Sequence, residues 1–115
     1  MKIVGKTDIG LVRETNQDAF KIVALGQSAG FALVCDGMGG VNGGDRASSI
    51  AKGEISESIK ASFVEGMEED QIRNVMLRAI DAANQKIYKT AKGHPELTGM
   101  GTTVVLVILY DGKAY

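Results

Sequence analysis

The sequence has few of the features that mark secreted, membrane-spanning or nucleic-acid-binding proteins. Its 115 residues contain one cysteine, Cys35, so no disulfide can form within the chain. The N-terminus lacks the apolar core of a signal peptide, and no segment approaches the roughly 20 apolar residues that span a bilayer. With 13 basic and 14 acidic residues, the net charge of −1 offers no basic surface for nucleic acid or anionic lipid. We therefore expect a cytoplasmic protein without nucleic-acid or membrane partners.

Histidine is as scarce as cysteine. The one histidine, His94, stands beside Pro95 at the end of a predicted helix, far in sequence from the acidic motifs described below. A surface position explains it more simply than a role as metal ligand or general base. We therefore assign it no role in a site.

One glycine-rich block stands out from the rest of the chain. The apolar run 31–35 stops at Asp36, and five of the next eight residues are glycine. Glycine adopts positive φ freely and carries no Cβ, so this density indicates a tight loop or a close approach of the backbone to another group. Asp45 then opens a predicted helix. The predicted order is strand, acid, glycine loop and helix.

Several kinds of site could use such a block. A dinucleotide fingerprint requires G-x-G-x-x-G, but Asn42 stands where the last glycine belongs, and Asp36 would repel a pyrophosphate. A P-loop requires lysine after its last glycine, whereas Gly44 is followed by Asp45. A hard-metal site with Asp36 as a ligand fits the residue types. A solvent-exposed turn is the remaining alternative, and the glycine density together with a second acidic motif favours the metal site.

The second acidic motif lies upstream. Residues 13–18, RETNQD, form a polar stretch before a predicted strand over 19–25, which a short connection joins to the strand ending at Asp36. If these two strands pair antiparallel, Asp18 and Asp36 lie at the same end of the sheet. Taken alone, RETNQD fits an ordinary solvated loop about as well.

Two amphipathic helices are predicted to supply the core. The apolar fraction of 44% over 115 residues fits one domain with a modest core. From residue 45 onward, apolar residues recur every four positions through Phe63, and a second apolar face runs from Ile72 to Ile87. Gly93 and Pro95 are expected to end the second helix. This spacing indicates core packing.

Further strands are predicted at both ends of the chain. Residues 2–12 fit a first strand, and 102–110 are apolar after two threonines, which indicates an interior strand covered on both faces. Asp111-Gly112 predicts a type I′ hairpin into a partner strand that begins at 113–115. Because the partner strand stops after three residues, we expect the front part of a longer domain, truncated within a hairpin. An unpaired edge of this kind favours self-association through the C-terminal strand.

Three motifs in order carry a resemblance to a known family. RETNQD, then DGMGG from Asp36, then GTT at 101–103 resemble the bacterial metal-dependent Ser/Thr protein phosphatases of the PPM family, type 2C, along the whole chain from Thr7. The resemblance implies an α+β fold, an α-β-β-α sandwich of two antiparallel sheets flanked by helices, of which residues 1–115 form the N-terminal part. It also implies a centre with two Mn²⁺ or Mg²⁺ ions between the sheets.

The resemblance assigns roles to four residues. Asp36 resembles the carboxylate that bridges both metals, and Gly37 the backbone carbonyl ligand. Asp18 resembles the acid that supports the metal-bound waters, and Arg13 the arginine that binds the substrate phosphate. These types suit the chemistry, because oxygen donors prefer hard cations and a guanidinium matches phosphate.

Two departures from the family pattern bear on function. Val41 stands where many relatives have a histidine that resembles a general acid, and the family's further metal-binding aspartates would follow Tyr115. The resemblance therefore implies that an intact parent hydrolyses phosphoserine and phosphothreonine in proteins, the products of a Ser/Thr kinase, while this segment alone is inactive. The alternative is a non-catalytic pseudophosphatase or phosphoprotein-binding module.

Overall fold

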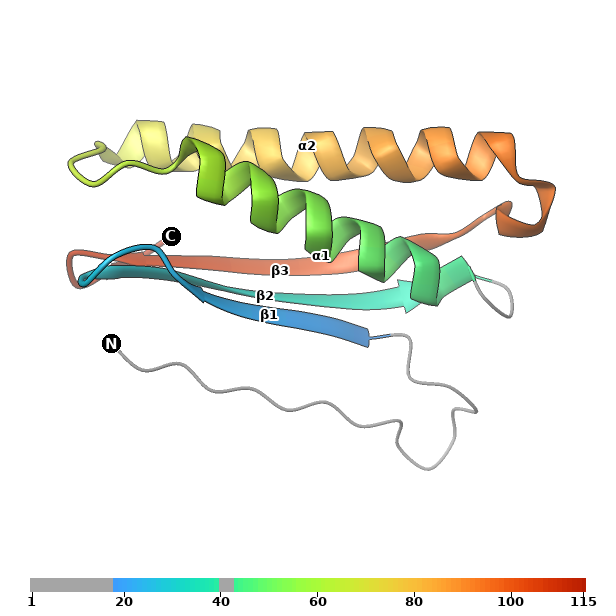
Figure 1. The fold of residues 1–115 in the computed structure, drawn as a ribbon, viewed down its shortest axis with the longest axis horizontal. Helices are drawn as coiled ribbons and strands as arrows, with labels where there is room; N and C mark the ends of the chain where they lie inside the picture. Colours follow the sequence, from blue (N-terminus) through green and yellow to red (C-terminus); the bar gives the residue numbers. More distant parts are fainter. Residues whose placement is uncertain (1–17, 40–42) are drawn as a thin grey trace, which may run out of the picture.

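The computed structural model describes residues 18–39 and 43–115. The predicted first strand over 2–12, Arg13 and Val41 lie outside these residues. The elements in chain order are β1 (Asp18–Ala24), β2 (Ala29–Met38), α1 (Gly43–Ser62), α2 (Glu69–Gly93), the 3₁₀ helix η1 (Pro95–Leu97), β3 (Gly101–Tyr110) and β4 (Lys113–Ala114). Figure 1 shows α1 lying over one face of the sheet, with α2 stacked on the far side of α1.

The strands form one antiparallel sheet in the order β1-β2-β3-β4. The antiparallel pairing of β1 with β2, expected from the sequence, is confirmed. β2 extends beyond its apolar run at both ends, because Gly30 pairs with Leu109 and Met38 pairs with Gly101. Pairing with β3 thus sets the length of β2, which hydrophobicity alone underestimates.

Both helices begin and end close to the predicted positions. α1 starts at Gly43, two residues before Asp45, and Gly43 is buried. Its predicted apolar stripe is confirmed, because Ala51, Ile55 and Ile59 are fully buried. At the start of α2 the backbone N–H of Glu68 donates to the side chain of Gln71 at 2.9 Å, and the helix ends at Gly93 as predicted.

The core lies between the sheet and the two helices. Phe31, Leu33 and Cys35 of β2 are at most 1% exposed and pack against α1, α2 and Ile108. The prediction that Cys35 is a small buried hydrophobe is confirmed. Burial raises the pKa of its thiol to about 11, and the charge of Lys52 only partly opposes that rise.

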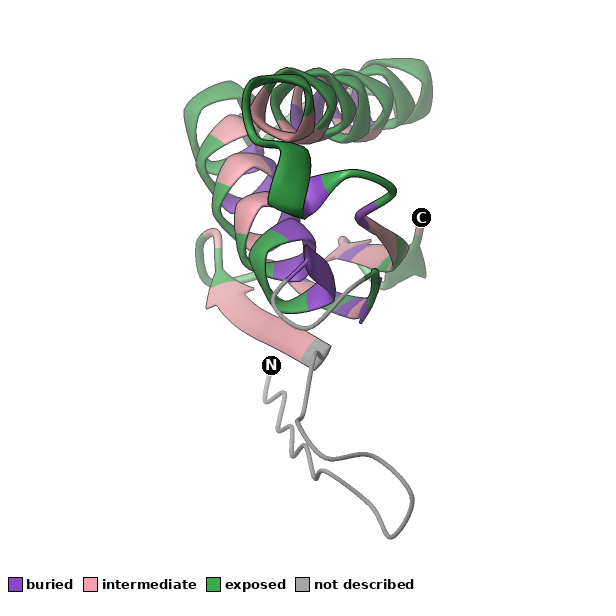
Figure 2. Ribbon diagram, turned by 90° about the vertical axis from the view of Figure 1, so that its right-hand side faces the viewer, coloured by how far each residue is buried: buried purple, intermediate pink, exposed green. Residues whose placement is uncertain are grey.

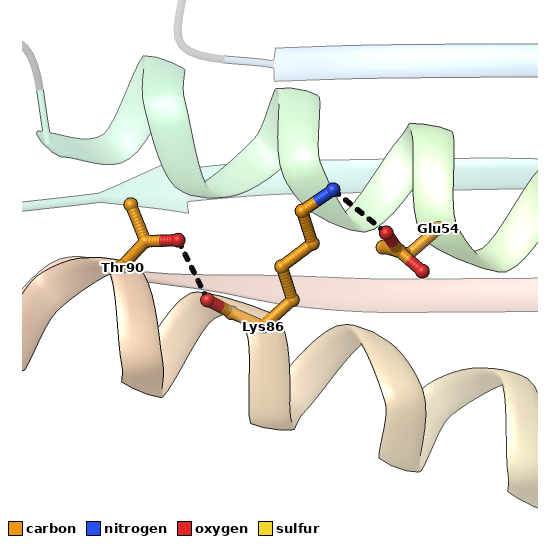
Figure 3. Close-up of polar contacts among 3 residues, drawn as sticks. All are labelled: Glu54, Lys86 and Thr90. Atoms are coloured by element: carbon orange, nitrogen blue, oxygen red, sulfur yellow. Dashed lines mark hydrogen bonds and ion pairs between the residues drawn. The ribbon is translucent and has the colours of Figure 1, made fainter.

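A polar contact joins the exposed sides of the two helices. Lys86 Nζ of α2 lies 2.8 Å from Glu54 Oε1 of α1, and Thr90 Oγ1 donates to the Lys86 carbonyl at 2.8 Å (Figure 3). Lys86 is 57% exposed, so solvent screens most of the attraction. Apolar packing therefore holds the helices together.

The sheet face turned away from the helices is open in the described structure (Figure 2). Val34 of β2 is 49% exposed and its cross-strand partner Val105 is 62% exposed. The prediction that β3 is covered on both faces is wrong for the described residues, because both helices lie on the same side of the sheet. We call this surface the open face.

The hairpin at the end of the chain has the predicted geometry. Asp111 and Gly112 have φ values of 51° and 74°, as a type I′ turn requires at both central positions. β4 then pairs antiparallel with the last two residues of β3, Leu109 and Tyr110. No helix within 18–39 and 43–115 is long and apolar enough to cross a bilayer.

Candidate metal centre

Asp18 and Asp36 occupy neighbouring strands at one end of the sheet. The register places Asp36 of β2 directly opposite Asp18 of β1 on one side and Thr103 of β3 on the other. We call Asp18, Asp36 and Thr103 the acidic row. The prediction that the two acids share one end of the sheet is confirmed.

The residue types of the acidic row suit a hard cation. Carboxylate oxygens are the ligands that hard cations prefer, and the register brings two aspartates to neighbouring positions on the sheet. The backbone carbonyl of Gly37, the next residue along β2, adds an oxygen of the same kind. The donor types therefore fit Mn²⁺ or Mg²⁺.

The Thr103 hydroxyl contacts the backbone of Asp36. Its Oγ1 accepts from the Asp36 N–H at 3.3 Å and donates to the Asp36 carbonyl at 3.4 Å. The sequence offers GTT as a motif, but its contact with Asp36 spans 67 residues and follows from strand pairing alone. The GTT motif includes Thr103 but gives it no role. The strand register places it directly opposite Asp36.

The described glycines at the two ends of the loop, Gly39 and Gly43, lie close to another part of the chain, as the glycine-rich composition predicts. Gly39 has a φ of 135°, and a Cβ placed there would lie 3.0 Å from the Met100 Cα. A Cβ at Gly43 would lie 3.1 Å from the Met100 Cβ. Side chains are therefore excluded on both sides of the loop by the residue that precedes β3.

The remaining predicted residues lie elsewhere or outside the described residues. Arg13 is outside them, so its role in binding the substrate phosphate stays a prediction. His94 is exposed, as predicted, and its Nδ1 lies 3.4 Å from Glu96 Oε1. Among the residues that the structure describes, no group of three or more His, Cys, Asp or Glu side chains is placed to hold a metal ion. The row itself supplies two acids.

Comparison with known proteins places this arrangement in a family. A family model described as protein phosphatase 2C matches residues 12–115. The chain is 36% identical over 115 residues to a protein of Streptococcus pyogenes serotype M6 whose name places it among the 2C-type protein phosphatases, covering 99% of this chain and 45% of that protein. The chain therefore spans less than half the length of this relative.

Solved structures agree with the sequence matches. The serine/threonine phosphatase Stp1 from Staphylococcus aureus superposes with a TM-score of 0.80 at 31% identity, over 92% of this chain and 41% of that one. The catalytic domain of the phosphatase PstP, crystallised with two manganese ions, shares the fold with a TM-score of 0.67 at 24% identity, over 95% of this chain and 51% of that one. With its ordered motifs and its fold, the chain belongs to the protein phosphatase 2C (PPM) family of bacterial serine/threonine phosphatases.

Proposed function

We propose that the complete protein containing this chain hydrolyses phosphoserine and phosphothreonine in proteins, with two Mn²⁺ or Mg²⁺ ions as cofactors. Family membership supports the reaction class. The observation that carries the proposal is the acidic row, in which Asp36 faces Asp18 at the sheet end where the glycine block begins. Its substrates would be the phosphorylated products of a Ser/Thr kinase in the cytoplasm.

Each residue of the proposed site has a separate role. When bound, two divalent cations supply a Lewis acid that lowers the pKa of water and neutralises phosphoryl charge. Asp36 and the Gly37 carbonyl would hold the cations, and Asp18 would orient water by accepting hydrogen bonds. Arg13 would bind the substrate phosphate with its planar guanidinium. Thr103 would keep the Asp36 backbone in place through its two hydroxyl contacts.

Val41 bears on the leaving group. A valine cannot donate a proton, so the departing serine or threonine alkoxide would take its proton from water or from another residue. General acid catalysis typically contributes 10²–10⁴-fold to a rate. We therefore propose that the enzyme favours substrates with good leaving groups, such as aryl phosphates.

We further propose that residues 1–115 are the N-terminal part of a single sandwich domain whose second sheet covers the open face. The apolar pair Val34 and Val105 on that face and the 45% coverage of the relative support this arrangement. Produced alone, the chain would lack turnover and would self-associate. Its C-terminal strand β3 pairs with β4 only through its last residues, which leaves an edge that favours pairing with another chain.

The function is tested with the complete protein and a phosphothreonine peptide. We expect phosphate release that depends on Mn²⁺ and stops on addition of a chelator, and its loss in Asp36→Asn. Binding of the peptide without turnover in Mn²⁺ would support the alternative of a phosphoprotein-binding module. Turnover in Asp36→Asn equal to that of the wild type would remove Asp36 from the site.

A further inference from the structure

Met100 lies where three parts of the described structure meet. It is 8% exposed and packs with Ala47 of α1 and Leu97 of η1, just before β3 begins at Gly101. We call Ala47, Leu97 and Met100 the Met100 cluster; the partly buried Ile50, Ile87 and Ala91 pack against it. The Met100 side chain is therefore anchored from both helices, so the backbone at residue 100 has little freedom to move.

The backbone at residue 100 in turn leaves no room at the two ends of the glycine loop. A Cβ on Gly39 would lie 3.0 Å from the Met100 Cα and 3.3 Å from the Met100 Cβ, and a Cβ on Gly43 would lie 3.1 Å from the Met100 Cβ. These separations are shorter than ordinary van der Waals contact between carbon atoms. Residue 100 thus fixes where the chain leaves β2 and where it enters α1.

The contact continues along the strand that follows. Met38 pairs with Gly101, Gly37 with Thr102 and Asp36 with Thr103, so residues 101–103 lie in register beside residues 36–38. Thr103 adds the hydroxyl contacts to the Asp36 backbone. The stretch that carries the proposed metal ligands is therefore held on one side by the strand ladder and at its end by residue 100.

We propose that Met100 is a positioning residue for the metal centre. Its anchored side chain holds residue 100 against Gly39 and Gly43, and this contact fixes the backbone that presents Asp36 and the Gly37 carbonyl. A carbonyl ligand has no side-chain freedom, so its position depends on what holds the main chain. The inference rests on the proposed function, and it assigns a role to a residue that α1, α2 and η1 separate in sequence from the glycine block.

The first test compares two alanine variants of the Met100 cluster in the complete protein. Met100→Ala should weaken Mn²⁺ binding about 10-fold or more, as loss of an outer-shell support does, and Met100→Leu should retain it because leucine refills the cluster. Leu97→Ala is the matched control, since Leu97 is 7% exposed in the same cluster. Calorimetric titration gives the affinity and thermal unfolding gives Tm. Equal affinity losses in both alanine variants would overturn the proposal, because packing alone would then explain them.

The second test inserts a methyl group between the loop and residue 100. Gly43→Ala should weaken Mn²⁺ binding, because its Cβ meets the Met100 Cβ. Gly53→Ala is the matched control in the same helix, since nothing lies within 4 Å of a Cβ there; it should raise Tm and leave the affinity unchanged.

The two failures are distinguishable. Wild-type affinity in both Gly43→Ala and Met100→Ala would overturn the positioning role and leave the proposed function standing. A wild-type protein that binds no Mn²⁺ would overturn the proposed function and this inference with it.

Discussion

The same strands form both faces of the sheet, but the side chains on one face are buried and those on the other are exposed. On β2, Phe31 and Leu33 are at most 1% exposed beneath the helices, whereas Val34 on the open face is 49% exposed. On β3, Ile108 is fully buried and Val105 is 62% exposed. Both faces are apolar in sequence, so hydrophobicity does not distinguish them. The face that the helices cover carries the stability of the described structure, and the open face carries the acidic row at its end.

The strongest test of this comparison removes one large side chain from each face. Phe31→Ala should lower the free energy of unfolding by about 3–5 kcal/mol, because it leaves a cavity beneath the helices. In the 115-residue chain, Val105→Ala should change it by less than about 0.5 kcal/mol, as exposed substitutions do. Urea unfolding measures both.

The same pair of variants in the complete protein sharpens the comparison. If a second sheet covers the open face, Val105→Ala should cost about 1–3 kcal/mol more there than in the 115-residue chain. An equally small cost in both proteins would show that the open face stays exposed.

The pH dependence of stability tests the buried face. The Cys35 thiol has its pKa raised from 9.0 to about 11 by burial, so between these values the unfolded chain loses its proton while the folded chain keeps it. Stability is therefore fully present below pH 9 and falls as pH rises toward 11, by up to about 2–3 kcal/mol. Urea unfolding of the wild type and of Cys35→Ala between pH 9 and 11 isolates the contribution of the Cys35 thiol to the free energy of unfolding. Parallel pH profiles for the two proteins would contradict it.

Stabilisation by Mn²⁺ tests whether the acidic row, at the end of the open face, binds a metal ion. With free Mn²⁺ at ten times its dissociation constant, the complete protein should gain about 1.4 kcal/mol of stability, because the ion binds only the folded state. Asp36→Asn should lose this gain, whereas Val34→Thr, two residues earlier on the same face, should keep it. Thermal unfolding with and without Mn²⁺ measures the gain. If Mn²⁺ stabilised Asp36→Asn as much as the wild type, the prediction would be wrong.

The smallest effect is expected on the outer side of the helices. Lys86→Ala removes the ion pair with Glu54, whose partners are 57% and 32% exposed, and should cost about 0.2–1 kcal/mol. The neighbouring Lys89→Ala serves as a control, because Lys89 is exposed and the described structure gives it no ion pair. A double-mutant cycle with Glu54→Ala gives the pair energy. A value above about 2 kcal/mol would show that this contact matters more to helix packing than its exposure suggests.

Much of the local structure follows from the sequence. The four-residue spacing of Ala51, Ile55 and Ile59 defines the buried side of α1, and Asp111-Gly112 defines the hairpin turn. The break in the apolar run at Asp36, followed by five glycines in eight residues, defines the end of β2 and the position of the candidate site. These features depend on neighbours within a few residues, where backbone sterics and helical or strand periodicity decide the outcome.

Other features were decided only by tertiary structure. The sequence allows Asp18 and Asp36 to meet at one sheet end, but their direct opposition follows from the strand register. The contact of Met100 with Gly39 joins residues about 60 positions apart, and nothing near either residue encodes it. The continuous apolar run of β3 predicts burial on both faces, whereas the described helices cover one. Long-range contacts depend on how whole elements pack, because each strand offers several faces and registers of similar hydrophobicity and only the assembled layers choose among them.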